Sequence, residues 1–440
     1  MRSVKLIGLA SSMLVLGGSR SPPRASYHVS PTGSAGGRGT LSRPWDLATA
    51  LAGAGGKIRP GDTIWIHGGR YKGMFRTQLV GDSDRPILFR QAPREHATID
   101  GTLFAQGAYL TFWGFEIMQS HPATYGLQAQ TNGGKFINLI IHNAGSMGVS
   151  FWTPGVNGEV YGCIVYHNGT HENQDHGVYV HNELGTKLLA DNIFFDNLAY
   201  GVHAYATAHN PPQHNIRVIG NISFNNGTIS HRYKAKGNIL VGSEVPMTGI
   251  EVSDNLLFFS GSSGENLRLG YAAVPNGDAV VTGNFVWGGE TALKIGAGTW
   301  AALRVESNTL GGATRVVTVT APTPISLERA NVYYESPRAP PMAAVFVRPN
   351  RYEAGRAHIA IYNLNHAAAV KVDLSGVLTV GQRYELHDVQ DLFGRSTAGG
   401  TFTGDSVSVP MRGTFSAFLL TTSDSTASAR PSGTPRRRAR

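Results

Sequence analysis

The stretch NGTHENQDHGVYVHNELGTKLLADNIFFDNLAYGVHAY, Asn168–Tyr205, contains one short apolar–polar pattern twice, as HGVYVHN and, 24 residues later, as YGVHAYA. Each copy alternates with a period of two, which is typical of a β-strand with one buried face. In register, two tyrosines and two histidines fall on outward positions: Tyr179 and His181 in the first copy, His203 and Tyr205 in the second. The pattern predicts two neighbouring strands with a shared aromatic outer surface.

The phrase DNIFFDN between the copies belongs to a longer repeat: FINLIIHN, YGCIVYHN, ADNIFFDN, IGNISFNN, SDNLLFFS and TGNFVWGG. The aligned turn position recurs every 24–34 residues and holds Asn138, Cys163, Asn192, Asn221, Asn255, Asn284 and Asn308. A repeat of this length with two or three short strands predicts a parallel β-solenoid, in which neighbouring turns bury each other's faces. Each Asn can hydrogen-bond its own backbone and the Asn of the next turn. We interpret Cys163, the single cysteine, as a small buried residue of this ladder and not as a nucleophile.

The segment before the repeats predicts a short strand, a Gly/Ser-rich loop and a helix near Trp45–Ala52 that caps the open end of the core. PGDTIWIHGGRYKG and PILFRQAP then supply the strands of the first turn. These residues resemble the N-terminal segment of secreted right-handed parallel β-helix proteins of the pectate-lyase-like superfamily, over about Tyr27 to Pro322. The resemblance implies the fold but not the reaction, because that superfamily includes lyases, hydrolases, epimerases and phage adhesins.

The predicted fold is all-β, with a right-handed parallel β-helix over residues 26–325 and an antiparallel β-sandwich over 326–423. The sandwich resembles modules appended to carbohydrate-active enzymes, and it either covers the C-terminal end of the solenoid or binds sugar. Residues 1–25, with a basic start and a short apolar run, predict a secretory signal and hence an extracellular or periplasmic protein. Residues 424–440 predict a disordered basic tail. We expect a monomer.

The formal charge of +9 arises mostly from the two ends of the chain. Removing the basic residues of the predicted signal and tail leaves about +1 for the body, so no general nucleic-acid footprint remains. No other stretch reaches the length of a membrane span.

Outward residues at one register of a solenoid form a straight row with neighbours about 4.8 Å apart. The first row holds Gln128, Ser150, Tyr179, His203, Leu240, Arg268 and Lys294, and the second holds Gln130, Trp152, His181, Tyr205, Gly242, Gly270 and Gly296. Aromatic rings can stack on sugars, and cations can bind carboxylates or sulfates. We therefore predict a surface for a long acidic polysaccharide, although an ordinary solvated face would carry the same residue types.

On these rows and in the loop before them, we predict catalytic roles for Tyr179, His203, His181, Tyr205 and His176 and substrate-binding roles for Trp152, Gln128, Arg268, Lys294 and Asp175. Asp175 and His176 come from the preceding loop, HENQDH, where Asp175 can orient His176, bind a metal or serve only the turn. The family resemblance implies Ca²⁺ held by carboxylates of neighbouring turns. Because the alignment places no two carboxylates on adjacent turns, we predict no metal site, and a requirement for Ca²⁺ stays open.

Two mechanisms compete for this surface. Glycoside hydrolysis needs two carboxyl groups across the scissile bond, and the rows offer no such pair. β-Elimination from a uronate needs a base, an acid and a cation for the substrate carboxylate, which His, Tyr, Arg and Lys can supply. We therefore predict a lyase that cleaves an acidic polysaccharide. A hydrolase, a C5-epimerase and a non-catalytic adhesin remain alternatives.

Overall fold

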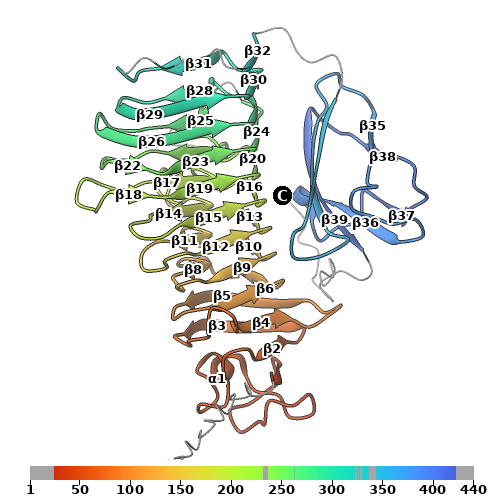
Figure 1. The fold of residues 1–440 in the computed structure, drawn as a ribbon. Coiled ribbons are helices and arrows are strands. Elements are labelled where there is room, and N and C mark those ends of the chain that lie inside the picture. Colours follow the sequence, from red (N-terminus) through yellow and green to blue (C-terminus); the bar gives the residue numbers. More distant parts are fainter. Residues whose placement is uncertain are drawn as a thin grey trace, which may run out of the picture.

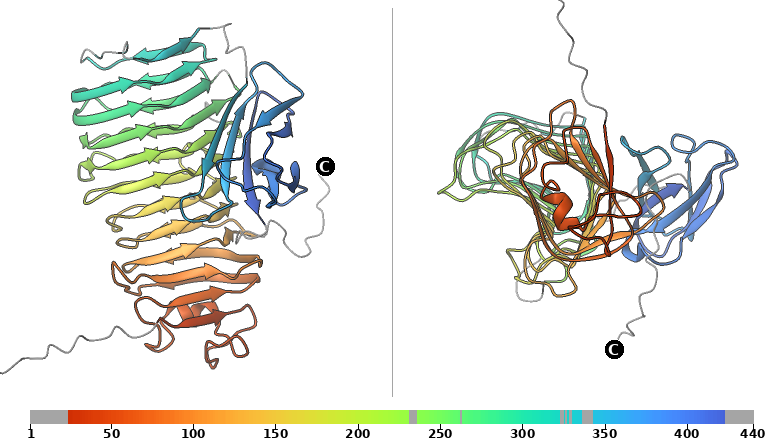
Figure 2. Two further views of the ribbon diagram at one scale, coloured as in Figure 1. Left: turned by 45° about the vertical axis from the view of Figure 1, so that its right-hand side comes forward. Right: turned by 90° about the horizontal axis from the view of Figure 1, so that it is seen from below.

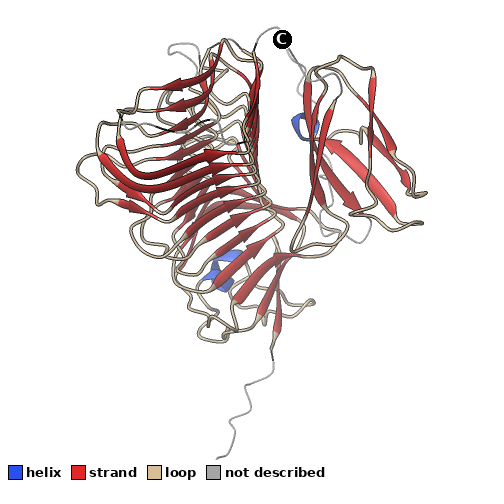
Figure 3. Cartoon of the chain, turned by 45° about the horizontal axis from the view of Figure 1, so that its top comes forward, coloured by secondary structure: helices blue, strands red, loops and turns tan. Residues whose placement is uncertain are grey.

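The structure is a computed structural model that describes residues 24–230, 236–261, 263–322, 325, 327, 330–335 and 343–422. The chain forms a parallel β-helix with a small antiparallel β-sandwich beside it (Figure 1), as the repeat predicts. Almost all regular structure is strand (Figure 3). Within the described residues, no helix has the length and apolar character needed to cross a lipid bilayer.

The turns of the β-helix stack into three faces of parallel strands, here called faces A, B and C. Face A comprises β1 (Ser26–Val29), β2 (Thr63–Ile66), β4 (Ile87–Gln91), β6 (Leu110–Trp113), β9 (Lys135–Ile137), β12 (Glu159–Tyr161), β15 (Lys187–Ala190), β19 (Ile216–Ile219), β23 (Ile250–Ser253), β26 (Pro275–Thr282) and β29 (Thr299–Glu306). Face B comprises β7 (Glu116–Met118), β10 (Ile140–His142), β13 (Ile164–Tyr166), β16 (Ile193–Phe195), β20 (Ile222–Phe224), β24 (Leu256–Phe259), β27 (Phe285–Gly288), β30 (Thr309–Gly311) and β32 (Val332–Tyr334).

Face C comprises β3 (Gly69–Thr77), β5 (Ala97–Ala105), β8 (Leu127–Ala129), β11 (Val149–Phe151), β14 (Val178–Val180), β17 (Val202–Ala204), β21 (Ile239–Val241), β25 (Glu265–Leu269), β28 (Thr291–Ile295) and β31 (Arg315–Val319). The long strand β5 joins faces B and C, because its first half pairs with β7 and its second half with β8. A short extra pair, β18 (Gln213–His214) and β22 (Met247–Thr248), extends two of the turns.

The inward side chains of all three faces form one continuous apolar core. The helix α1 (Leu47–Leu51) closes its N-terminal end, as predicted, and buries Leu47, Ala50 and Leu51. Asp46 begins this helix, since its Oδ1 accepts a hydrogen bond from the Thr49 N–H at 2.7 Å.

The predicted asparagine ladder is confirmed for five turns and continues one turn further. Its members are Asn192, Asn221, Asn255, Asn284, Asn308 and Asn331, and each of the first five side-chain amides donates to the Oδ1 of the next Asn at 2.9–3.0 Å. The same amide nitrogens also donate to carbonyl oxygens of the preceding turn. The ladder therefore satisfies backbone groups that the bend between faces A and B leaves without strand partners.

The predicted place of Asn138 in this ladder is wrong by one residue. Ile140 pairs with Ile164, so the residue in register with Cys163 is Leu139. Asn138 instead occupies the preceding bend position, with φ of 53°, in the left-handed region that Asn tolerates better than most residues. Cys163 itself is fully buried in the ladder, and its backbone N–H donates to Asn192 Oδ1, which supports its structural role.

A second asparagine ladder, which the sequence analysis did not identify, supports the bend between faces B and C. It comprises Asn168, Asn197, Asn226, Asn238 and Asn266, and its side-chain amides are linked at 2.7–2.9 Å. The two bends that flank face B are thus both fixed by buried amides.

Replacing Asn221 with Leu is expected to lower the free energy of unfolding by about 1–3 kcal/mol, because buried carbonyl and amide groups lose their partners. Asn221 is fully buried, donates to Leu189 O and Asn255 Oδ1, and accepts from Asn192. Chemical denaturation followed by circular dichroism measures the change. The exposed Asn365, replaced in the same way, should shift stability by less than about 0.5 kcal/mol. Equal effects of the two substitutions would contradict the structural role of the ladder.

The sandwich packs against face B along the side of the β-helix and does not cover its end (Figures 1 and 2). One sheet has the order β33 (Ala344–Pro349), β34 (Ala357–Tyr362), β39 (Phe415–Thr422), β36 (Arg383–Asp388) and β37 (Ala398–Thr401), and the other pairs β35 (Ala369–Val372) with β38 (Val407–Pro410). A 3₁₀ turn, η1 (Val389–Asp391), follows β36. Packing on face B is apolar, which explains why the outward side chains there are aromatic or aliphatic.

The last turn of the β-helix reaches beyond the predicted domain boundary at residues 325 and 326. β32 pairs with β30, and Asn331 ends the first ladder, so this turn extends to Tyr334. The predicted signal segment, residues 1–25, and the predicted tail, 424–440, lie outside the described residues except for Arg24 and Ala25.

Candidate functional site

The register of face C brings the predicted first row together. Gln128 pairs with Ser150, Ser150 with Tyr179, Tyr179 with His203, His203 with Leu240, Leu240 with Arg268 and Arg268 with Lys294. The sequence thus predicted the order of this row correctly, because inward valines and leucines fix which residues point outward.

A hollow opens on face C at the point where the row holds Tyr179 and His203. It is lined by Met147, Asn173, Gln174, His176, Tyr179, Tyr200, His203, Tyr205, Thr207, Lys236, Leu240 and Tyr271. The loop before β14 and Lys236, ahead of β21, form its walls, and the strands β14 and β17 form its floor. None of the described residues that line it is an aspartate or a glutamate.

Stacked rings hold the floor of this hollow in place. The ring centroids of Tyr179 and His203 are 5.2 Å apart, and those of His203 and Tyr205 are 4.9 Å apart. His176 lies closest to His203, at 4.1 Å between centroids, and Tyr200 stacks on His203 at 5.1 Å. Such a cluster leaves little rotational freedom to any of its members.

Both histidines of the hollow are neutral near pH 7. Burial lowers the pKa of His176 to about 3, and burial together with neighbouring His176 holds the pKa of His203 well below the ordinary histidine value. His176 Nδ1 accepts a hydrogen bond from the Tyr200 N–H at 3.2 Å, which fixes its tautomer with the proton on Nε2. His176 is almost fully buried, so it supports His203 more than it contacts a ligand.

Tyr179, Tyr200 and Tyr205 of the hollow are protonated near pH 7. Burial raises the pKa of Tyr179 to about 12 and also raises the pKa of Tyr200. Tyr205 Oη donates to Glu244 Oε1 at 2.5 Å, a contact that holds Tyr205 at the edge of the hollow. Tyr179 is partly exposed and pairs with His203 on the neighbouring strand, so it is placed to deliver a proton beside this base.

Lys236 brings the one ammonium group to the lining and was not predicted from the sequence. Lys236 is the first described residue after position 230 and lies ahead of β21. Burial lowers the pKa of its ammonium group. No hydrogen bond or ion pair joins its Nζ to the described residues. No feature of the stretch ISHRYKAKG distinguishes Lys236 from its basic neighbours, and His231 of the same stretch lies outside the described residues.

Two predicted site residues, His181 and Asp175, are placed differently from the prediction. His181 is fully buried under Trp152, with ring centroids 4.6 Å apart, and its Nε2 lies 3.3 Å from Pro211 O, so it cannot reach a substrate. Asp175 is also buried: its oxygens accept from Ser146 Oγ and from two backbone N–H groups of its own loop. Asp175 therefore shapes the loop and does not bind substrate.

The two predicted cations of the row, Arg268 and Lys294, share one carboxylate, that of Glu265. Arg268 Nη1 lies 3.0 Å from Glu265 Oε2, and Lys294 Nζ lies 2.5 Å from Glu265 Oε1. The Arg268 guanidinium also lies over the Tyr271 ring at 4.9 Å. Arg268 therefore supports a wall of the hollow through Tyr271, and Lys294 lies one turn further away.

Trp152 and Gln128 extend the site toward the N-terminal turns. The Trp152 ring stacks on Tyr179 at 4.8 Å and stays partly exposed, as a sugar platform requires. Gln128 lies two strands from Tyr179, outside the lining of the hollow. Among the described residues, no group of three or more His, Cys, Asp or Glu side chains is arranged to hold a metal ion.

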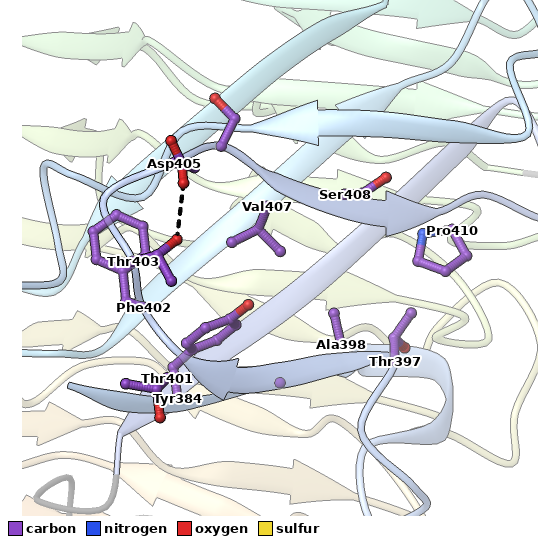
Figure 4. A pocket seen from close by; sticks show the side chains of 12 residues that line it. Tyr384, Thr397, Ala398, Thr401, Phe402, Thr403, Asp405, Val407, Ser408 and Pro410 are labelled. Atoms are coloured by element: carbon purple, nitrogen blue, oxygen red, sulfur yellow. Dashed lines mark hydrogen bonds between the residues drawn. The ribbon is translucent and has the colours of Figure 1, made fainter. Parts of the chain in front are cut away.

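A separate hollow lies within the sandwich, between β37 and β38 (Figure 4). Tyr384 and several threonines and serines line it, and Thr403 Oγ1 donates to Asp405 Oδ2 at 3.1 Å. All its lining residues belong to the sandwich, so it shares no residue with face C.

Residues 27–239 match the family described as Pel9A-like, right handed beta helix region. Among solved structures, pectate lyase Pel9A is similar with a TM-score of 0.53 and 16% identity, over 70% of this chain and 82% of that chain. Less similar are XylC in complex with xylose (TM-score 0.45, 9% identity, 90% and 100% coverage) and an alginate lyase from Paenibacillus sp. str. FPU-7 (TM-score 0.41, 16% identity, 64% and 99% coverage). No curated protein sequence matches the chain. The family match and the observed turns confirm the resemblance found in the sequence: residues 27–239 form a right-handed β-helix that matches the Pel9A-like model.

Proposed function

We propose that this protein cleaves an acidic, uronate-containing polysaccharide by β-elimination in the hollow of face C. One observation carries the proposal: the hollow combines a neutral histidine, a protonated tyrosine and a lysine ammonium group, without a carboxylate among its described lining residues. Such a set serves proton transfer next to an anionic sugar. The similarity to pectate lyase Pel9A, a protein of the same fold, agrees with this reaction class.

The roles follow from protonation and position. Neutral His203 accepts the proton from C5 of the uronate, the C4–O4 bond breaks, a double bond forms between C4 and C5, and Tyr179 donates its proton to the leaving O4. Lys236 binds the substrate carboxylate and stabilises the negative charge that develops there. Water then returns the proton from His203 to Tyr179. The 5.2 Å between the two ring centroids allows both groups to reach one sugar ring.

The alternatives make different demands on the same hollow. Two-carboxylate glycoside hydrolysis requires acidic groups about 5 to 9.5 Å apart across the scissile bond. Glu244, the acid bound to Tyr205, lies outside the lining, and Glu265 is occupied by Arg268 and Lys294. A C5-epimerase would use the same His203 and Tyr179, so only the product distinguishes it from a lyase.

The test is a panel of polygalacturonate, alginate and glycosaminoglycans incubated with the purified protein. A lyase gives ultraviolet absorbance from the unsaturated uronate together with new reducing ends on one polymer. New reducing ends without absorbance would indicate a hydrolase. Incorporation of solvent deuterium at C5 without cleavage would indicate an epimerase, and binding without any turnover would indicate an adhesin.

The proposed roles also predict the pH dependence of kcat/KM. Because the pKa of His203 is lowered, this base stays neutral below the ordinary histidine value of about 6.5, and we expect activity at about pH 5.5 to stay within about twofold of that at pH 7. On the alkaline side, the lowered pKa of Lys236 removes its charge earlier than the ordinary lysine value of about 10.5, so KM should rise. This rise of KM at alkaline pH should be absent in the variant Lys236→Met. An acid limb centred near pH 6.5 would contradict the assignment of His203.

A further inference from the structure

A second hollow lies on face C, at its N-terminal end. It is bounded by the end of α1 and lined by Arg76, Gln78 and Gln106 of the first two turns. It lies on the same outward rows as Tyr179, several turns before it, and nothing in the proposed reaction uses it.

Arg76 is oriented for a ligand in this hollow. Its side chain is exposed, and its guanidinium carbon lies 3.7 Å from the centre of the Phe104 ring, which restricts the group to one face of that ring. No acidic side chain among the described residues pairs with Arg76. It thus differs from Arg268 and Lys294, which share Glu265.

The two hollows are joined by one continuous row. Arg76 pairs with Phe104, Phe104 with Gln128, Gln128 with Ser150 and Ser150 with Tyr179. Four steps of strand spacing separate Arg76 from Tyr179, about 19 Å along the helix axis.

The two rows between the hollows hold no charged side chain: Phe104, Gln128 and Ser150 lie in the first row, and Gln106, Gln130 and Trp152 lie in the second. In the adjacent row, Gln78 donates to Gln106 at 3.4 Å, and Gln106 donates to Gln130 at 3.1 Å. Trp152 follows Gln130 on the next turn and stacks on Tyr179. Amides of this kind hydrogen-bond sugar hydroxyls, and an aromatic ring packs on a sugar face.

We propose that the Arg76 hollow is a distal subsite that binds the carboxylate of a uronate on the same polysaccharide chain, about 19 Å from the sugar at Tyr179. The inference rests on the proposed function, because it assumes a saccharide chain in the Tyr179 hollow. The glutamine row contacts the hydroxyl groups of the sugars between the two ends. The protein therefore prefers chains long enough to span both hollows.

The test compares Arg76→Ala with the wild type on size-fractionated oligomers of the polymer that the protein cleaves. For the wild type, KM should fall once the oligomer is long enough to reach Arg76. The variant should raise KM for these long oligomers about tenfold, with kcat and the KM for short oligomers unchanged. Arg383→Ala, which removes another exposed arginine on the sandwich strand β36, is the matched control and should change neither. Equal KM values for Arg76→Ala and the wild type on long oligomers would overturn the subsite.

A binding measurement separates failure of the subsite from failure of the reaction. In affinity electrophoresis through gels that contain polygalacturonate or alginate, the wild type should be retarded by at least one polymer, and Arg76→Ala should be retarded less than Arg383→Ala. This result supports the subsite even if no polymer is cleaved, in which case β-elimination alone is wrong. The subsite is wrong if no polymer retards the wild type, or if Arg76→Ala and Arg383→Ala are retarded equally. Either result overturns the subsite even if cleavage is observed.

Discussion

Tyr179→Phe and His203→Ala are each expected to lower kcat about 10²-fold or more on the true substrate, with the fold intact. Tyr179→Phe removes only the hydroxyl that donates a proton to the leaving oxygen and keeps the ring that stacks on Trp152 and His203. His203→Ala removes the base. Initial rates of product formation measure both losses, and circular dichroism checks that the β-helix is unchanged.

Two matched substitutions control for effects outside the hollow. Tyr125→Phe and His121→Ala change the same residue types on the turn between β7 and β8, where neither side chain lines the hollow. Both should keep kcat within about twofold of the wild type, as most surface changes do. If Tyr179→Phe and His203→Ala retain the activity of these controls, the hollow on face C is not the active site.

Phe195→Ala is expected to lower the free energy of unfolding by about 3–5 kcal/mol. The Phe195 ring is fully buried on face B, stacked between Tyr166 at 4.8 Å and Phe224 at 5.0 Å. The sandwich covers this stack, since Leu419 and other residues of β39 belong to the same apolar cluster. Loss of the ring therefore opens a cavity in a region where both domains hold the surrounding side chains in place.

Denaturant unfolding followed by fluorescence measures this loss. Val380→Ala, at a highly exposed position of the sandwich, is the control and should change stability by less than about 0.5 kcal/mol. A loss below about 1 kcal/mol for Phe195→Ala would mean that the sandwich does not cover face B in solution.

The architecture could be predicted because its signals are local and repeated. The period-two alternation around Tyr179 and His203 sets which side chains point outward, and the asparagine at each turn sets the register of five successive turns. Where the asparagine is missing, the register is weaker. At Asn138 and Cys163 the sequence allowed a shift of one residue, and the structure shows that Leu139, not Asn138, is the partner of Cys163.

The site could be predicted only in part, because burial and ion pairing depend on contacts between distant residues. His181 is an outward residue by alternation, yet Trp152 of the preceding turn and Pro211 of an inserted loop cover it. Arg268 and Lys294 look like free cations in the sequence, but Glu265 lies between them. Lys236 is in an insertion, whose path the repeat does not determine.

The repeat pattern also did not predict where the sandwich packs on the β-helix. Outward Ile, Phe and Tyr residues on face B could equally have been read as strand formers, and only the second domain shows why they are apolar. From the sequence, we expected the sandwich either to cover the C-terminal end of the β-helix or to bind sugar. Packing along the side of the β-helix was not among these expectations.

The measurement that tests the central claim most directly is the mass of the products released from a defined uronate oligomer. β-Elimination divides the chain without adding water, so the fragment masses sum to that of the substrate, and one fragment carries the C4–C5 double bond. Hydrolysis adds one water, so the fragments sum to the substrate plus water. We predict products without added water, formed by the wild type and strongly reduced in Tyr179→Phe and His203→Ala. Products that contain the added water would contradict β-elimination by His203 and Tyr179.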